Sequence, residues 1–413
     1  MKQITITVLM AFFVALQVFA ERVDMREAGV DNQEALKNTE IINNTINRLN
    51  KAGGGTLFFP SGDYLTASIH MKSNITLELE AGATLRFSDN FDHYMPFVEM
   101  RHEGVMMKSF QPLIYATDAE NITIKGEGKL DGQGKAWWKE FFRVLIDLRD
   151  NGKRDINKYQ PLFEQANDMK TLYAETNVDW HSTLDRRFLR PPFIQPLRCR
   201  NVRIEGITIV NSPFWTVNPN FCDNVTVKGV TINNVPSPNT DGINPESCSN
   251  VHISDCHISV GDDCITIKSG RDLQARKIGR PCENITITNC TMLSGHGGVV
   301  IGSEMSGGVK KVTISNCVFD GTDRGIRIKS TRGRGGVVED IRVSNVVMSD
   351  IKREAVVLNL KYSQMKMEKK SERTPVFRNI FVTGLTVRGT QTPLKVDGLP
   401  EAPIEGIVFR DIA

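Results

Sequence analysis

Short runs in which apolar and polar residues alternate recur along the chain, most clearly from about residue 200 onward. Each run opens on Asn-Val, Asn-Ile or a related pair and then places β-branched residues at every second position. This alternation is typical of a β-strand with one buried and one polar face. The runs begin at Asn74, Asn121, Asn201, Asn224, Asn250, Asn284, Lys311, Asp340 and Asn379. The chain is therefore predicted to be a series of similar units, each with two or three short strands.

The spacing of these runs predicts the fold class. From Asn201 onward it varies from 23 residues, between Asn201 and Asn224, to 39 residues, between Asp340 and Asn379, and such periods are typical of solenoids. Long helical patterns are missing from nearly every unit, and short strands joined by turns can close by coiling into a parallel β-helix. The leucine pattern of a horseshoe is missing, and a propeller needs a steadier spacing. We therefore predict an all-β fold, a parallel β-helix (solenoid).

The Asn that opens most units suits a sharp turn. Asn tolerates left-handed backbone, and its side chain can bond to nearby backbone groups. Four of these residues also match the acceptor sequence for N-glycosylation, at Asn74, Asn121, Asn224 and Asn284. Because the pattern recurs with the repeat, we favour a different role. We predict a buried ladder in which Asn side chains of successive coils bond to one another.

Two segments depart from the repeat. Residues 31–51 have a helical apolar pattern, and the ends of solenoids need covers. We predict a short N-terminal capping helix there, with Asp31 as its cap. Its apolar face is expected to contain Ala35, Leu36, Ile42, Ile46 and Leu49. Residues 139–195 are charged, aromatic and mixed in pattern, and we predict a non-repeat excursion that contains Trp180 and Phe188. Excursions of this length are usually functional, so we expect it to wall off one end of a groove.

The N-terminal residues predict export. Lys2 is a basic start, the stretch up to Phe19 is mostly apolar, and Val18-Phe19-Ala20 is an acceptable cleavage site. Residues 1–20 are therefore predicted to be a signal peptide, and residues 21–413 a single parallel β-helix domain. No later stretch is apolar enough to span a bilayer. We expect an exported protein, periplasmic or extracellular.

Charge narrows the choice of partner only slightly. The 413 residues include 51 Lys and Arg and 48 Asp and Glu, which gives a net charge of +3. This balance selects no class of partner. We predict a monomer with no nucleic-acid partner and no membrane span.

The eight cysteines do not have the pattern of a disulfide framework, although an exported chain would allow one. Seven of them occupy two positions of the repeat, at Cys199, Cys222, Cys248 and Cys282 and at Cys256, Cys290 and Cys317. Free Cys packs as a small buried hydrophobe. We therefore predict ladders of reduced thiols.

Four segments that end β-type runs carry the polar residues of interest. They are residues 240–244, 262–266, 296–300 and 323–327. Their alignment gives four columns, which are Thr240, Asp262, His296 and Asp323; Asp241, Asp263, Gly297 and Arg324; Asn244, Thr266, Val300 and Arg327; and Glu246, Lys268, Gly302 and Lys329. Carboxylates, a histidine, an arginine and lysines are thus predicted to meet at one edge of the solenoid.

The carboxylates of this alignment suit acid and base chemistry. Asp241 lies one coil from Asp263, and Asp262 lies one coil from His296, at a strand spacing of about 4.8 Å. Carboxylates at so short a distance cannot all ionise freely, so one of them should have a raised pKa. A carboxyl with a raised pKa acts as a general acid, and one with a lowered pKa acts as a general base. Hydrolysis of a glycosidic bond uses such a pair.

Cations at the same edge indicate an acidic substrate. Arg327 and Lys329 alternate with Ile326 and Ile328, so both are predicted to point out of the coil. Arg binds a carboxylate in a bidentate manner and Lys adds a compact charge, which implies a substrate such as a uronic acid. Lys268 shares the column of Lys329. Calcium is the other interpretation of clustered carboxylates, but a calcium site would not include two further cations. No metal or cofactor is predicted.

These motifs resemble those of a known family. The segments Asn239-Thr240-Asp241, Gly261-Asp262-Asp263, Gly295-His296-Gly297 and Arg327-Ile328-Lys329 match, in order and approximate spacing, the four signature motifs of the polygalacturonases, family 28 of the glycoside hydrolases. The resemblance covers roughly residues 190–336 and, more weakly, residues 53–59 and 131–138. It implies a right-handed parallel β-helix that hydrolyses pectic α-galacturonosyl linkages with inversion and without a cofactor.

The resemblance also implies a role for each matching residue. Asp262 would protonate the leaving oxygen, while Asp241 and Asp263 would activate water. His296 would tune Asp262 and contact the substrate hydroxyls. The residues expected to bind a pectic polysaccharide or a galacturonide oligosaccharide are Arg327, Lys329, Asn239 and Lys268.

Two other functions use a similar scaffold. A calcium-dependent pectate lyase also has a β-helix, and a non-catalytic β-helix could bind acidic polysaccharide without cutting it. His296 and the three aspartates favour hydrolysis over both. The excursion favours exo action, in which single galacturonic acid units leave from a chain end.

Overall fold

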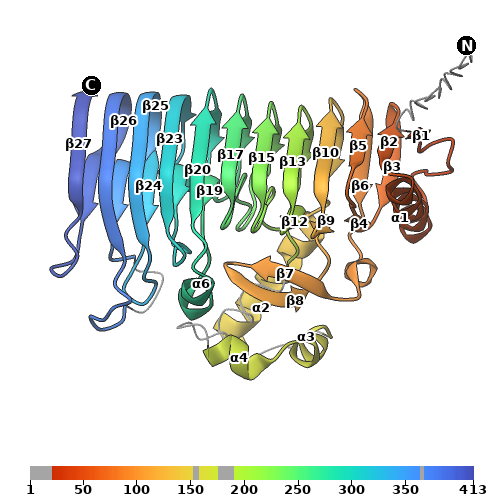
Figure 1. Ribbon diagram of the computed structural model, residues 1–413, viewed down its shortest axis with the longest axis horizontal. Coiled ribbons are helices and arrows are strands. Elements are labelled where there is room, and N and C mark those ends of the chain that lie inside the picture. The colour runs from red at the N-terminus through yellow and green to blue at the C-terminus, as the bar shows by residue number, and fades with distance from the viewer. Residues whose placement is uncertain (1–20, 152–157, 175–189, 363–366) are drawn as a thin grey trace, which may run out of the picture.

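The strands form a long row of stacked coils. The computed structural model describes residues 21–151, 158–174, 190–362 and 367–413. Neighbouring coils pair in parallel, and the row extends from the N-terminal end to the last strand of the chain (Figure 1). The predicted all-β fold, a right-handed parallel β-helix with an N-terminal capping helix, is confirmed. The predicted signal peptide, Trp180 and Phe188 lie outside the described residues.

Each coil contributes to three parallel stacks of strands. The first stack follows the repeat Asn and contains β1 Glu21–Asp24, β2 Gly55–Phe59, β5 Ile75–Leu79, β10 Glu120–Gly126, β13 Arg200–Glu205, β15 Asp223–Lys228, β17 Ser249–Ser254 and β20 Cys282–Thr288. The second contains β3 Gly62–Thr66, β6 Ala83–Phe87, β11 Lys129–Asp131, β14 Thr208–Val210, β16 Thr231–Asn233, β18 His257–Ser259 and β21 Thr291–Ser294. The third contains β4 Ile69–His70, β9 Ile114–Thr117, β12 Ile194–Leu197, β19 Asp263–Ile267, β22 Gly297–Ile301 and β24 Ile326–Lys329.

The C-terminal coils consist of longer strands that continue around the corners. These are β23 Val309–Asp320, β25 Val337–Asn359, β26 Val376–Asp397 and β27 Glu405–Ile412. Strand β25 pairs with both β23 and β24, so one strand joins two stacks. The coil geometry is therefore kept to the end of the chain.

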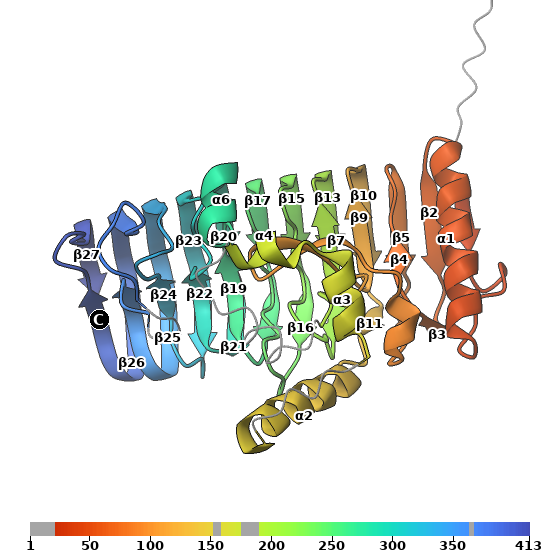
Figure 2. The same cartoon turned by 90° about the horizontal axis from the view of Figure 1, so that it is seen from below.

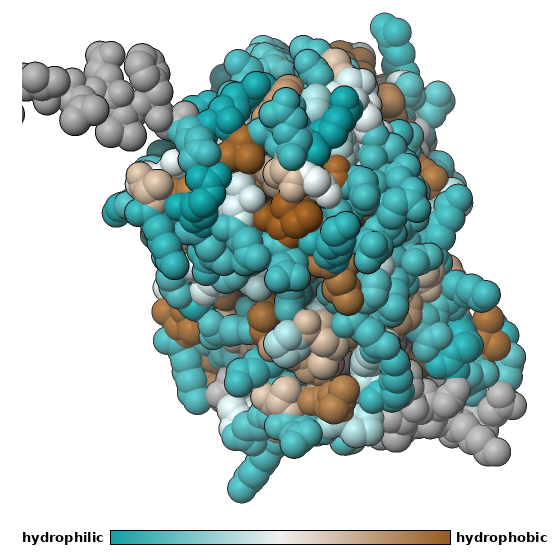
Figure 3. Space-filling model, turned by 90° about the vertical axis from the view of Figure 1, so that its right-hand side faces the viewer, coloured by the Kyte–Doolittle hydropathy of each residue, from teal (hydrophilic) through white to brown (hydrophobic). Residues whose placement is uncertain are grey.

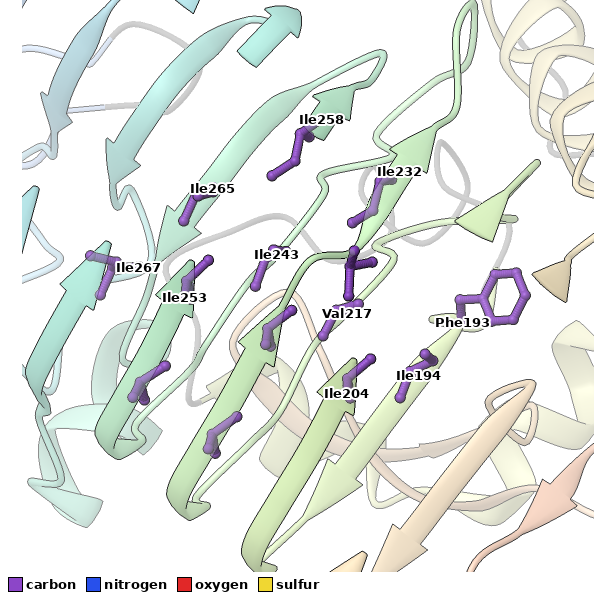
Figure 4. Packing of buried hydrophobic residues seen from close by; sticks show 14 of the residues in the cluster. Phe193, Ile194, Ile204, Val217, Ile232, Ile243, Ile253, Ile258, Ile265 and Ile267 are labelled. Carbon is purple, nitrogen blue, oxygen red and sulfur yellow. The ribbon is translucent and has the colours of Figure 1, made fainter. Parts of the chain in front are cut away.

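The interior of the β-helix is filled by aliphatic side chains at the same position of successive coils. Ile194, Val217, Ile243 and Ile265 follow one another through parallel bridges, and all four are at most 2% exposed. Figure 4 shows these residues with the aliphatic residues of the other stacks around them. Burial of such a side chain contributes roughly 1.5–3 kcal/mol. The alternation in the sequence thus fixes which residues face inward and which are left for chemistry.

The predicted Asn ladder exists, but at the surface. Nine residues that open the repeats, from Asn74 to Asn379, have φ between 55° and 63°. The side-chain amide of Asn121 donates to Asn74 at 2.7 Å, and that of Asn224 donates to Asn201 at 2.7 Å. The prediction that the ladder is buried is wrong, because these side chains point away from the filled interior toward solvent.

The cysteines form the predicted ladders. All eight are free and buried. The Sγ atoms of Cys222, Cys248 and Cys282 each lie 3.4 Å from the backbone N–H of the cysteine in the coil before. Stacked thiols thus pack as part of the core.

Helix α1, Ala35–Lys51, covers the N-terminal end as predicted, with corrections to its details. Asp31 is not its cap, because the helix begins four residues later, after Glu34. Leu36 is 55% exposed, whereas the other four residues of the predicted face are buried. The surface at this end of the molecule is mostly hydrophilic (Figure 3).

Two excursions lie on one side of the β-helix (Figures 1 and 2). The predicted one contains α2 Lys135–Asn151, α3 Gln160–Ala166 and α4 Met169–Ala174, so it begins slightly before residue 139. The other was not predicted, and contains the 3-10 helix η1 Phe91–Tyr94 and the antiparallel hairpin of β7 Val98–His102 and β8 Val105–Ser109. A short helix, α6 Asp272–Ile278, follows β19. None of the helices in the described parts of the chain is long and apolar enough to cross a membrane.

Candidate active site

The third stack brings the predicted columns together. Parallel bridges join Ile243 to Ile265 and Ile265 to Val299, and β22 pairs Val299 with Ile326 of β24. Asp263 lies opposite Gly297 in the same register. The alignment made from the sequence is therefore the alignment of the coils. Asp241, Asp262, His296 and Arg327 come from four successive coils at one edge.

Asp241 is buried at this edge. It is 2% exposed, and its Oδ2 accepts hydrogen bonds from Asn244 at 3.0 Å and from Thr266 at 3.2 Å. Burial, followed by the charge of Asp262, raises the pKa of Asp241 to about 7. Asp241 is therefore partly protonated near neutral pH.

Asp262 lies just before β19 and contacts His296. His296 Nδ1 is 3.0 Å from Asp262 Oδ1. Burial acts to raise the pKa of Asp262, but the hydrogen bond and charge of His296, with the charges of Lys329 and Lys268, outweigh burial and hold the pKa below its usual range. We expected one carboxyl with a raised pKa, and that carboxyl is Asp241 rather than Asp262. The reason is that His296 contacts Asp262 directly, whereas burial and the charge of Asp262 dominate at Asp241.

His296 is the exposed member of the cluster. Its side chain is 51% exposed, whereas that of Asp262 is 18% exposed. The hydrogen bond to Asp262 raises the pKa of His296 to about 9, against the effect of burial. A half-exposed imidazolium at the surface of the cluster can contact a ligand while it holds Asp262.

Asp263 pairs with the two cations of the last motif. Lys329 Nζ lies 2.8 Å from Asp263 Oδ2, and Arg327 Nη1 lies 3.8 Å from Oδ1. Ile326 and Ile328 are buried in the core, so Arg327 and Lys329 lie on the outer face of β24 as predicted. The two cations thus border the carboxylates directly.

Tyr362 is a neighbour of these cations that the sequence analysis missed. Its ring centre is 5.6 Å from the guanidinium carbon of Arg327 and 5.4 Å from Lys329 Nζ. Strand β25 pairs Asn359 with Lys329, so Tyr362 follows the Lys329 column by three residues in the next coil. An extension of the column alignment by one coil is the signal that could have found it.

Asn239 was predicted to bind substrate, and the structure places it beside Asp262. Its amide donates to Asp262 Oδ2 at 3.3 Å, and its Oδ1 accepts from Arg190 Nη2 at 2.8 Å. Arg190 is fully buried and also donates to the carbonyls of Pro213 and Pro238. Arg190 has no position in the repeat, because it lies near the end of the predicted excursion rather than in a strand.

Lys268 was also predicted to bind substrate, and the structure places it buried beside Asp241 and Glu304. It is 4% exposed, and its ammonium pairs with Glu304 at 2.9 Å and with Asp241 at 3.6 Å. Burial acts to lower the pKa of Lys268, and the two carboxylates outweigh it and raise the pKa. Its charge is therefore directed at Asp241 and Glu304.

The predicted excursion reaches the edge of the cluster. The ring centre of Phe141, on α2, is 4.3 Å from the guanidinium carbon of Arg190. Trp138 Nε1 donates to the carbonyl of Ser212 at 2.9 Å. Helix α2 is thus fixed against the coil before the one that carries Asp241.

The cluster combines carboxyl groups that can transfer protons with the side chains of Arg327, Lys329 and Lys268 beside them. Among the residues that the structure describes, no group of three or more His, Cys, Asp or Glu side chains is placed to hold a metal ion. One carboxyl has a raised pKa, another a lowered one, and cations lie at the rim. This arrangement permits general acid and base catalysis on an anionic sugar.

Comparisons with known proteins agree with this chemistry. The sequence model of the glycosyl hydrolases family 28 matches residues 178–413. A probable polygalacturonase of Vitis vinifera is 30% identical over 394 residues, which are 93% of this chain and 72% of that protein. An endo-polygalacturonase of Pectobacterium carotovorum subsp. carotovorum is 30% identical over 304 residues, 72% of this chain, and the chain spans only 65% of its length.

A solved structure extends the likeness to the whole fold. It is that of a hyperthermoactive exopolygalacturonase from Thermotoga maritima, with 35% identity and a TM-score of 0.83 over 96% of this chain and 87% of that chain. Both the family model and the grape relative cover more than half of the sequence. The chain therefore belongs to the glycosyl hydrolases family 28, with the polygalacturonases.

Proposed function

We propose that the chain is an exported, monomeric enzyme that releases galacturonic acid from the ends of pectic chains by inverting hydrolysis. The observation that carries this proposal is the cluster of Asp241, Asp262 and Asp263 in neighbouring coils, with Arg327 and Lys329 at its rim. Carboxylates supply the acid and the base of glycosidic hydrolysis. The two cations suit a sugar that carries a carboxylate of its own.

In the proposed reaction, Asp262 gives its proton to the leaving glycosidic oxygen. Asp241 and Asp263 hold the water that attacks the anomeric carbon from the opposite face, and the proton of that water passes to the base. The glycosidic C–O bond breaks, and the aspartates end with the number of protons with which they began. Asp263 suits this role because its buried Oδ1 accepts no hydrogen bond from the residues that the structure describes.

The position of the shared proton makes substrate binding part of the proposal. In the unbound protein the pKa values favour the proton on Asp241, whereas the reaction needs it on Asp262. Two coupled carboxyls share a proton, and either site can hold it. Lys329 lowers the pKa of Asp262 more than Lys268 does, whereas at Asp241 the order of the two lysines is reversed. A uronate bound to Lys329 would neutralise that charge and favour the protonated form of Asp262.

Exo action is supported by helix α2. It packs through Phe141 onto Arg190, whose guanidinium holds Asn239 beside Asp262. A helix at this position would close the groove on one side of the cleavage point and leave room for a terminal sugar. The similar exopolygalacturonase of Thermotoga maritima supports the same choice.

A time course of polygalacturonic acid digestion tests this proposal. We expect monomeric galacturonic acid as the earliest product, with a slow fall in viscosity, and we expect the rate to persist in chelator. Early oligomers of mixed length would contradict exo action. A product that absorbs in the ultraviolet, formed only with calcium, would instead indicate a pectate lyase.

A further inference from the structure

Lys268 is enclosed between two carboxylates. Its ammonium lies 2.9 Å from Glu304 Oε2, 3.6 Å from Asp241 Oδ2 and 4.1 Å from the centre of the Trp215 ring. The side chains of Lys268 and Glu304 are 5% and 9% exposed. Buried charges are poorly screened by solvent. The positive charge that Asp241 senses therefore depends on how strongly Glu304 holds the same ammonium.

Glu304 is fixed by contacts on its other oxygen. Oε1 accepts from Arg271 at 3.2 Å, from Arg334 at 3.4 Å and from Ser303 at 3.0 Å, which directs Oε2 toward Lys268. Burial acts to raise the pKa of Glu304, but Lys268, Arg271 and Arg334 outweigh it and hold the pKa well below its usual range. Glu304 is therefore held as an anion at neutral pH.

We propose that Glu304 is a positioning residue that draws Lys268 away from Asp241, so that Asp241 retains the proton shared by the catalytic aspartates. Without the anion, the ammonium would pair with Asp241 alone, and Asp241 would lose its proton at lower pH. The enzyme would then lack the proton that Asp262 must deliver. This inference rests on the roles proposed above for Asp241 and Asp262.

Two anions and two cations are the charges that act most strongly on Asp241. Asp262 and Asp263 raise its pKa, whereas Lys268 and Lys329 lower it. Of the two lysines, Lys268 is held by Glu304 at 2.9 Å, whereas Lys329 is held by Asp263 at 2.8 Å. A change at Glu304 acts on Asp241 through Lys268.

The decisive measurement is the pH dependence of kcat/KM on digalacturonic acid. The limb at high pH reports loss of an essential proton from the free enzyme, and we expect it near pH 7, the pKa of Asp241. In the Glu304→Gln variant this limb should move to lower pH by about one unit, since an unshared cation at this range shifts a pKa by at least that much. The Glu304→Asp variant should restore the wild-type limb.

A second variant should move the limb at high pH in the opposite direction. Lys268→Met removes the cation from Asp241, so the limb at high pH should move to higher pH. Glu401→Gln is the matched control, because the side chain of Glu401 is also 9% exposed and pairs with a cation, Arg332, at 2.6 Å, while Glu401 is not among the charges that act most on Asp241. It should lower the melting temperature without moving the limb.

Two outcomes would overturn the proposal. One is a folded Glu304→Gln variant with an unshifted limb, and the other is a Lys268→Met limb that stays or moves to lower pH. The second outcome decides the matter if Glu304→Gln fails to fold. A wild type that releases no galacturonic acid would instead overturn the proposed function itself.

Discussion

Replacement of Lys329 by Met tests how the site recognises acidic sugars. The side chain of Lys329 is 8% exposed and contacts Asp263 at 2.8 Å. Met keeps most of the volume and removes the charge. We expect weaker binding of galacturonides because the carboxylate of the substrate loses one of two cationic partners.

The size of the effect follows from the contact. A hydrogen bond to a charged group contributes about 1.5–3 kcal/mol, and about 1.4 kcal/mol is a factor of ten. The value of kcat/KM on galacturonides should therefore fall by roughly 10- to 100-fold. Arg327 remains at 3.8 Å from Asp263, so part of the positive potential persists. A methyl-esterified oligomer carries no charge to lose, and its kcat/KM should fall less.

The assay is kcat/KM on free-acid and methyl-esterified oligomers for wild type and Lys329→Met. Lys310→Met is the control, since Lys310 is paired with Glu283 on another stack, at 3.4 Å. We expect no change in that variant. An equal loss on acid and ester in Lys329→Met would refute the reasoning, because it would show that Lys329 acts on the enzyme's own carboxylates rather than on the substrate.

Three further predictions concern the aspartates and cysteines. Asp262→Asn should still fold, with a lower melting temperature because the charged contact with His296 is lost, and should lose roughly 10²- to 10⁴-fold in rate, the usual contribution of a general acid; near-normal turnover would sink that role. Asp241→Asn should be inactive but, at pH 8, more stable to unfolding than wild type by up to about 4 kcal/mol. The pKa of Asp241 is raised to about 7 in the folded protein, so its contribution to wild-type stability is complete below the unfolded-state pKa and is lost as pH rises through 7. Equal stabilities of the two proteins at pH 8 would contradict this. Thiol titration of denatured, unreduced protein should find all eight cysteines free, and any disulfide would count against the ladders.

The sequence was sufficient to predict the coils and the register of the site. Strand residues alternate with period two, and a shift of the register by one residue would turn every side chain of the strand to the other face. Ile243, Ile265, Val299 and Ile326 therefore had to align, and this alignment brought Asp241 and Asp263 together.

Departures from the repeat were harder to predict. The β7–β8 hairpin and Arg190 lie outside any column, so no periodic signal marked them. Lys268 and Lys329 share a column but differ in their surroundings. The difference arises because Glu304, from the next coil, lies over Lys268, and only the folded chain shows this contact. The Asn ladder was placed in the interior because recurrence alone does not distinguish an inner turn from an outer one.

The most direct test of the account is the identity of the first product formed from short galacturonides. Proton NMR of a fresh digest distinguishes the two anomers before they equilibrate. Inverting hydrolysis of an α-linkage through Asp262 predicts the β-anomer of monomeric galacturonic acid. The α-anomer, or an unsaturated product, would contradict the account.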